Sequence, residues 1–148
     1  MKPNYPALLL PAYGVTLIAV PIAMTLDTMG RGAEPYLFLT VPALTCLYTA
    51  MFALPFVLPA AGLAFFIQLP AVDWWQTRAG RLLFALICAF LGAAILQLTI
   101  QALALVAAVA GGTAGWVATS PTWPLRLRLG LVLSAGLAVG LVQGIQYY

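Results

Sequence analysis

Long runs of uncharged, mostly apolar residues limit what this sequence can fold into. One run extends from Tyr36 to Leu69 and another from Leu82 to Ala110. A membrane-spanning helix needs about 20 such residues, whereas soluble domains are roughly a quarter charged. Here only 6% of the residues are charged and 64% are hydrophobic. The sequence therefore predicts an all-α, polytopic membrane helix bundle that forms a single domain over residues 1–148.

We expect four or five transmembrane helices, with five slightly favoured. Their approximate boundaries are 7–26, 36–58 with an extension to 69, 81–97, 102–119 and 125–147. As one straight helix, the second run would measure roughly 50 Å, against an apolar membrane core of roughly 30 Å. Prolines interrupt this run, so we predict that the long helix is broken near Pro55 and Pro59.

The number of spans depends on residues 82–110. Read as one tilted helix, they give four spans; split at the polar cluster Gln97–Gln101, they give a hairpin and five spans. The six basic residues favour five, because five of them then share one side: Lys2, Arg78, Arg81, Arg126 and Arg128. The positive-inside rule would make that side, and the N-terminus, cytoplasmic. Against this prediction, the hairpin turn lacks Gly, Pro and Asn, and its arms are short for a bilayer.

Two segments carry the residues expected at the membrane surface. In the first, Asp73 and Gln76 have the spacing of a helix capping box, and Trp74, Trp75, Arg78 and Arg81 are predicted interface anchors. In the second, we predict the same role for Trp123, Arg126 and Arg128, with Tyr147 and Tyr148 at the opposite surface. Asp27 and Arg31 are four residues apart, but we expect a solvated loop there and no ion pair.

A glycine zipper is the strongest packing signal. Gly136, Gly140 and Gly144 recur every four residues, which places them on one helix face together with Gln143. Gly111 and Gly115 repeat the spacing in the preceding span. In lipid, such faces let another backbone approach closely. We therefore predict that these six residues form a helix-packing or partner interface.

Other polar residues are read more simply. With five spans, the glutamines at 97, 101, 143 and 146 would gather at the outer end of the bundle, either as a polar vestibule or as side chains that reach the headgroups. Cys46 and Cys88 lie in apolar runs and are interpreted as small buried hydrophobic residues.

The residues needed for catalysis and metal binding are scarce. Histidine is absent, and the predicted spans contain no clear charged residue in their interiors. This composition argues against an enzyme, a metal site or an ion-coupled carrier. The basic residues are also too sparse for nucleic-acid binding. We predict no cofactor other than a bound lipid or another apolar molecule.

These observations favour a non-catalytic accessory subunit of a membrane protein complex. Such a subunit would pack against partner helices, lipid or an apolar cofactor, with the bilayer and other subunits, or further copies of itself, as partners. The alternative is a small homo-oligomeric transporter or channel for a neutral or lipidic substrate, supported by the proline-broken second span. The short loops and composition are similar to those of small multi-span proteins of the bacterial inner membrane, where we expect this chain.

Overall fold

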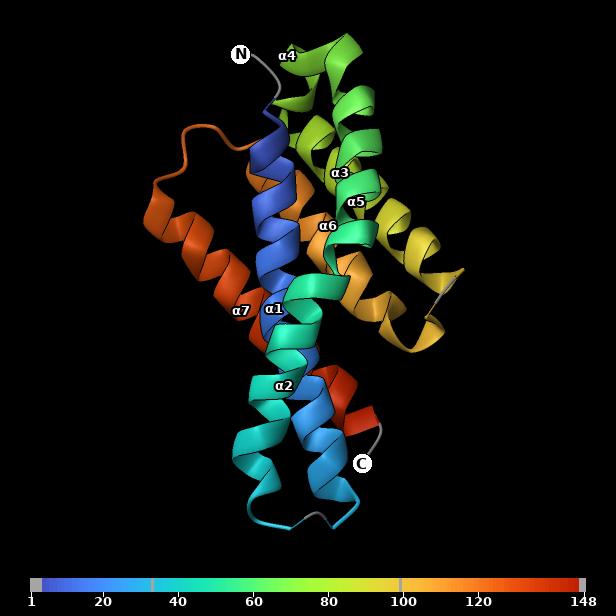
Figure 1. Ribbon diagram of the computed structural model, residues 1–148. Coiled ribbons are helices and arrows are strands. Elements are labelled where there is room, and N and C mark those ends of the chain that lie inside the picture. The colour runs from blue at the N-terminus through green and yellow to red at the C-terminus, as the bar shows by residue number, and fades with distance from the viewer. Residues whose placement is uncertain (1–3, 33, 99, 147–148) are drawn as a thin grey trace.

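The computed structural model describes residues 4–32, 34–98 and 100–146, without the side chain of Phe38. The protein is 88% helix, and the described part of the chain has no strands (Figure 1). The α-helices are α1 (Tyr5–Gly30), α2 (Leu37–Phe52), α3 (Leu54–Gln68), α4 (Val72–Trp75), α5 (Arg78–Gln97), α6 (Ala104–Ala118) and α7 (Leu125–Gln146). Two short 3₁₀ helices, η1 (Leu69–Ala71) and η2 (Gln101–Leu103), precede α4 and α6.

Five helical stretches among the described residues are long and apolar enough to cross a membrane. They are Tyr5–Gly30, Leu54–Trp75, Arg78–Gln97, Gln101–Ala118 and Leu125–Gln146, with α2 as a shorter apolar helix. The predicted polytopic helix bundle is confirmed, and the split of residues 82–110 into α5 and α6 agrees with five spans. The ends of α1 and α7 nearest the two termini lie at opposite ends of the molecule (Figure 1).

The second run is broken, as predicted, but the break lies at Ala53, two residues before Pro55. Pro55 occupies the first turn of α3, where the missing N–H costs no helical hydrogen bond. Two tyrosines of α1 attach this broken helix. Tyr13 Oη donates to the carbonyl of Ala50 at 2.6 Å, and Tyr5 Oη donates to the carbonyl of Leu58 at 3.0 Å. One bond lies on each side of the break.

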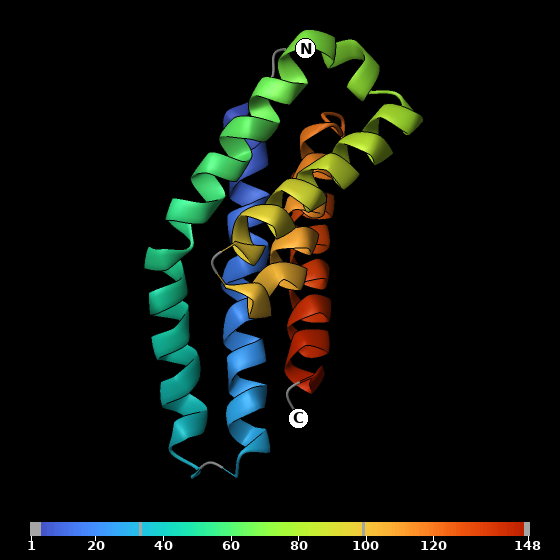
Figure 2. The same ribbon diagram turned by 90° about the vertical axis from the view of Figure 1, so that its right-hand side faces the viewer.

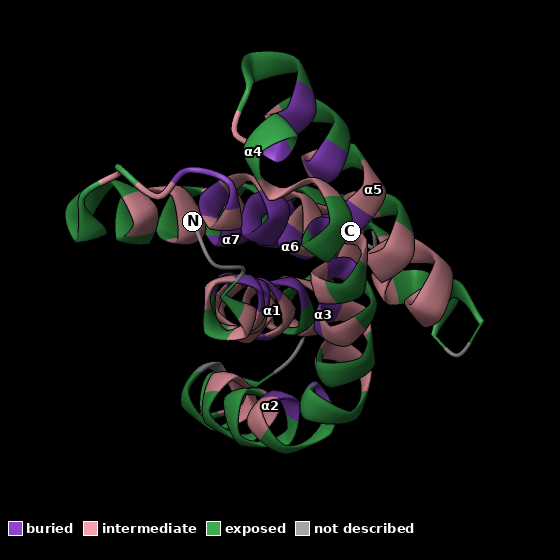
Figure 3. Ribbon diagram, turned by 90° about the horizontal axis from the view of Figure 1, so that it is seen from above, coloured by how far each residue is buried: buried purple, intermediate pink, exposed green. Residues whose placement is uncertain are grey.

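Helix α1 is the centre of the bundle. It packs against α2, α3, α6 and α7, and in the view from above it lies between α2 and the α6–α7 pair (Figure 3). Its Val15 and Ala19 are fully buried, and they share a core with Val106, Ala110 and other small residues. Because these side chains are short, the helices of this core can lie close together.

Helices α5 and α6 form a hairpin that does not run the length of the molecule. In two perpendicular views its turn lies well short of the α1–α2 connection (Figures 1 and 2). The turn contains Leu98 and Ile100, both exposed, while Thr99 of the predicted polar cluster lies outside the described residues. The C-terminal half of α1 therefore extends beyond the hairpin and packs against α2 and α7.

Two local predictions were wrong. Helix α1 continues to Gly30, beyond the expected end at 26, so Asp27 and Arg31 lie one turn apart and form an ion pair with an N–O distance of 3.1 Å. The predicted Asp73–Gln76 capping box is also not formed. Thr77 caps α5 instead, because its hydroxyl accepts a hydrogen bond from the N–H of Gly80 at 3.1 Å.

Candidate functional site

The glycine face of α7 lies against α1 of the same chain. A Cβ atom added at Gly140 would lie 2.9 Å from the carbonyl oxygen of Ala19, which is a backbone atom and cannot move aside. At Gly136 and Gly144 the added atom would meet side chains instead, Ile18 at 2.8 Å and Leu26 at 2.5 Å. Within the described chain, the space beside these glycines is therefore occupied by α1.

The second glycine pair holds the α5–α6 hairpin together. A Cβ atom at Gly111 would collide with the backbone carbonyl of Cys88, and one at Gly115 would lie 3.0 Å from the Cα of Ala85. Gly92 faces the carbonyl of Ala107 in the same way. The backbones of α5 and α6 are therefore in close contact. Together the two helices form one side of the bundle, which we call the α5–α6 wall.

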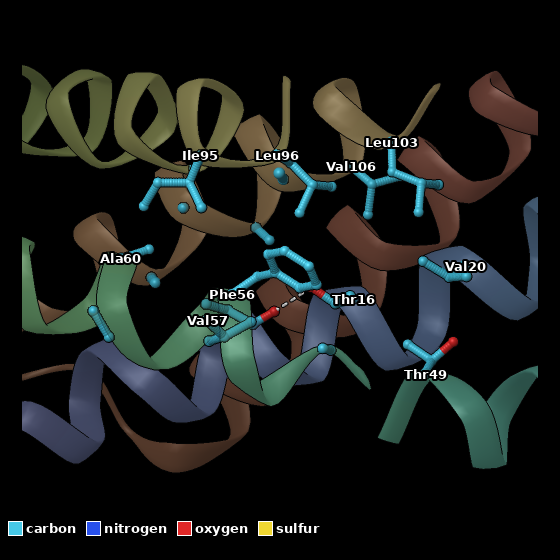
Figure 4. A pocket seen from close by; sticks show the side chains of 18 of the residues that line it. Thr16, Val20, Thr49, Phe56, Val57, Ala60, Ile95, Leu96, Leu103 and Val106 are labelled. Carbon is cyan, nitrogen blue, oxygen red and sulfur yellow. Dashed lines mark hydrogen bonds between the residues drawn. The ribbon is translucent and has the colours of Figure 1, made fainter. Parts of the chain in front are cut away.

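An apolar groove lies between that wall, α1 and the broken helix α2–α3 (Figure 4). The groove has a volume of about 230 Å³ and is open on one side. Its lining is almost entirely apolar, and its only hydroxyl-bearing side chains are those of Thr16, Tyr48 and Thr49. The hydroxyl of Thr16 already donates to the carbonyl of Ala12 at 2.9 Å. The groove therefore offers a ligand apolar contact and little hydrogen bonding.

Small side chains on three helices create the groove. Ala60 and Ala64 of α3 line it together with Ala110 and Ala114 of α6. Along α1 the lining residues are Leu8, Ala12, Thr16 and Val20, a strict four-residue series. Twelve residues of helix span about 18 Å, slightly more than half of an apolar membrane core of about 30 Å. The groove is thus long and narrow, about as deep as one lipid leaflet.

A smaller polar pocket of about 50 Å³ lies where the N-terminal end of α1 meets the C-terminal ends of α3 and α6. Gln68 at the end of α3 lines it, with only 5% of the residue exposed. The side-chain carbonyl oxygen of Gln68 is buried and accepts no hydrogen bond from any described residue. Asn4 lines the other side and makes no capping bond to α1. The pocket therefore contains a buried acceptor that needs a donor.

Arg128 of α7 borders the polar pocket and closes the loop after α6. Its Nε donates to the carbonyl of Trp123 at 3.0 Å, and its Nη2 donates to the carbonyls of Ser120 and Pro121 at 3.3 and 2.9 Å. These bonds fix the guanidinium beside the pocket. Its Nη1 takes part in none of the hydrogen bonds of the described residues, so two N–H groups remain for a ligand.

The other predicted interface anchors are placed differently from one another. Trp74 is half exposed, whereas Trp75 is buried against Phe84 with their ring centres 5.2 Å apart. Arg78 and Arg126 are exposed. Arg81 is partly buried, and its Nε has no partner among the described residues. Trp123 packs edge-on against Trp116 at 6.4 Å. Trp75 thus cannot offer its ring to lipid.

The four glutamines differ in exposure. Gln97 and Gln101 are exposed at the hairpin turn, and Gln146 is exposed near the end of α7. Gln143 is 3% exposed, and its side-chain carbonyl lacks a partner among the described residues. That these side chains share one end of the bundle, as a vestibule or at the headgroups, stays a prediction.

The two cysteines differ in exposure. Cys88 is buried beside the groove, as predicted, but Cys46 is exposed on α2. Lys2, Tyr147 and Tyr148 lie outside the described residues. In the described part of the chain, no three His, Cys, Asp or Glu side chains lie together.

A scan of protein-family models and searches of curated proteins and of solved structures found no match to this chain. The groove and the pocket are therefore the features from which we infer a function.

Sequence reasoning overlooked both of these sites. One signal was present: the series Ala60, Ala64 and Gln68 places two small residues and then a glutamine on one face of a helix. A polar residue at the end of a small-residue face in a membrane helix marks a place where polar and apolar ligand groups could meet.

Proposed function

We propose that this protein is a non-catalytic integral membrane subunit that holds a lipid chain, or another elongated apolar molecule, within a membrane complex. The single observation that supports this most is the apolar groove between α1, α3 and the α5–α6 wall. Its length of about 18 Å matches a chain that reaches from the membrane surface to the bilayer centre.

The glycine faces support the proposal indirectly. Helices of the same chain pack against Gly140 and Gly111, so a partner subunit would need to bind another surface. Helix α2 offers one, since Leu39 is 82% exposed and Met51 is 63% exposed. In lipid an exposed apolar side chain costs little, so this surface is available to acyl chains and to partner helices alike.

The test compares lipid retention in matched variants. The full chain is extracted in mild detergent, exchanged into fresh detergent and analysed by native mass spectrometry. We expect about one bound lipid per chain in the wild type. Ala60→Phe places a ring in the groove and should remove that lipid, whereas Ala43→Phe adds the same ring on an exposed part of α2 and should not. Equal retention in both variants would contradict the proposal.

The basic residues support an orientation. Arg78, Arg81, Arg126 and Arg128 belong to the N-terminal end of the bundle, and Arg31 to the opposite end. By the positive-inside rule, the N-terminus would be cytoplasmic in a bacterial inner membrane. A reporter that is active on only one side, fused after Tyr148, should then report the outer side.

A second candidate function is transport of a neutral or lipidic substrate by a homo-oligomer. It is favoured by the break at Ala53, because Ala53 itself lines the groove. Broken helices form binding sites in many transporters. Flux into vesicles that contain only the purified protein tests this candidate, and no flux above empty vesicles would exclude it for the solutes used.

A further inference from the structure

The polar pocket lies one helical step beyond the end of the apolar groove, and the two sites have no lining residue in common. On α1, Asn4 precedes the groove series Leu8, Ala12, Thr16 and Val20 by one four-residue step. On α3, Gln68 follows Ala64 by the same step. Residues four apart lie on one helix face, about 6 Å apart along the axis. The groove and the pocket are thus consecutive levels between the same helices.

The α6 helix repeats this pattern. Ala110 and Ala114 line the groove, and Ala118, four residues further on, lines the pocket. On α1 and α3 the lining changes from apolar to polar at this step, from Leu8 to Asn4 and from Ala64 to Gln68, whereas on α6 Ala118 is apolar and the neighbouring Thr119 contributes the polar group. A molecule that follows these faces meets apolar contacts over about 18 Å and polar groups at its end. This is the distribution of polarity in an amphiphile.

We propose that the two sites together bind one anionic phospholipid with a hydroxyl-bearing headgroup, such as phosphatidylglycerol. One acyl chain would lie in the groove, the phosphate against the free Nη1 of Arg128, and a headgroup hydroxyl would donate to the side-chain oxygen of Gln68. This inference rests on the proposed function, and it adds the class of lipid.

The charges favour an anionic lipid over a zwitterionic one. Among the described residues that line the pocket, Arg128 is the one charged side chain, and no carboxylate lies beside it. A guanidinium binds phosphate through paired N–H groups. An ammonium group beside Arg128 would be repelled, whereas a hydroxyl would not.

The volume and the buried acceptor favour a hydroxyl in the pocket. A pocket of about 50 Å³ exceeds the roughly 10–15 Å³ that a cavity needs to hold one water, so it has room for a small hydroxyl-bearing group. A buried acceptor without a donor destabilises the folded protein, and a ligand hydroxyl would remove that penalty. Gln68, which is 5% exposed, is such an acceptor.

The experiment measures headgroup selectivity. The full chain is placed in nanodiscs with equal amounts of phosphatidylglycerol and phosphatidylcholine, and the lipids that stay bound after release are counted by native mass spectrometry. We expect the wild type to be enriched in phosphatidylglycerol. Gln68→Met keeps the side-chain length and removes the acceptor, so the enrichment should fall about fivefold, as for one hydrogen bond worth about 1 kcal/mol.

The control variant is Gln97→Met, which changes an exposed glutamine at the hairpin turn and should keep the wild-type enrichment. Gln68→Met should unfold at the same or a higher temperature than the wild type, since the lost carbonyl has no partner among the described residues. An unchanged enrichment in Gln68→Met would overturn the inference. So would a wild type that shows no preference for phosphatidylglycerol over phosphatidylcholine and phosphatidylserine.

Two further measurements distinguish a failure of this inference from a failure of the proposed function. Free glycerol phosphate should not displace the lipid, because it lacks the chain that fills the groove; displacement at millimolar concentration would overturn the lipid assignment in favour of a soluble phosphate. If lipids bind with no headgroup preference and Ala60→Phe removes them, the proposed function stands and this inference fails. If the wild type retains no lipid at all, both fail.

Discussion

The two sides of α1 use small residues in opposite ways. Towards α7, the glycines let the two helices touch, so that a Cβ at Gly140 would lie 2.9 Å from the backbone of α1. Towards α3, Ala12 of α1 and Ala60 and Ala64 of α3 leave a groove of about 230 Å³. Comparable small side chains thus close one interface and leave the other open.

The difference comes from the shape of the facing helices. Helix α7 has no proline and keeps its glycine face towards α1. The opposite side is formed by two helices joined at Ala53, and Tyr13 and Tyr5 of α1 donate hydrogen bonds to carbonyls on either side of this break. A small-residue face therefore indicates close packing only when its partner is a continuous helix.

The largest expected effect is on the closest contact. Gly111→Ala would drive its Cβ into the carbonyl of Cys88, and neither backbone can yield without opening the α5–α6 hairpin. We expect a loss of about 1–3 kcal/mol in the free energy of unfolding. Thermal unfolding followed by circular dichroism in detergent measures it. The matched control is Gly112→Ala, whose Cβ would lie at an ordinary 3.5 Å from Ala89, and an equal loss there would contradict the reasoning.

The α1–α7 contact should be the next most sensitive. Gly140→Ala meets the Ala19 carbonyl at 2.9 Å, so we expect destabilisation of about 1–2 kcal/mol, within the range for overpacked cores. Gly130→Ala on the same helix has no neighbour within 4 Å and provides the control. The same unfolding measurement applies. If the two variants had the same unfolding temperature, the close contact between α1 and α7 would be refuted.

A smaller effect is expected where a side chain can move. At Gly14 of α1, an added Cβ would lie 3.0 Å from Cγ1 of Val132 in α7, a methyl group that a rotamer change can move. Gly14→Ala should therefore cost less than Gly140→Ala, about 1 kcal/mol or below. The difference in unfolding temperature between the two variants checks this order. A reversed order would show that the backbone of α1 adapts more easily than the side chain of Val132.

The sequence predicted the bundle and the broken second helix and slightly favoured five apolar spans over four, but it placed the second span at 36–58 with an extension to 69, where the structure has Leu54–Trp75. It did not predict which helices meet. Gly140 could have faced a partner as well as α1, because four-residue periodicity identifies a face and not its neighbour. The capping role of Thr77 was missed because Asp73 offered a similar local pattern.

The candidate site was less predictable than the fold. Groove residues such as Ala60 and Val106 come from separate helices, and their distance depends on the bend at Ala53. Gln68 is a pocket residue only because the fold brings it to the same pocket as Asn4, Ala118 and Arg128. Such a site arises from tertiary arrangement, about which a single sequence contains little information.

The smallest effect, with the opposite sign, is expected on the open side of α1. Gly62 lies within α3, and a Cβ there would find no atom within 4 Å. Gly62→Ala should therefore add helix propensity without a clash and stabilise the fold by about 0.5–1 kcal/mol. A rise in unfolding temperature, with bound lipid unchanged because Gly62 does not line the groove, is the expected result. A loss of stability as large as that of Gly140→Ala would mean that α3 is as closely packed as α7, and the contrast between the two sides of α1 would not hold.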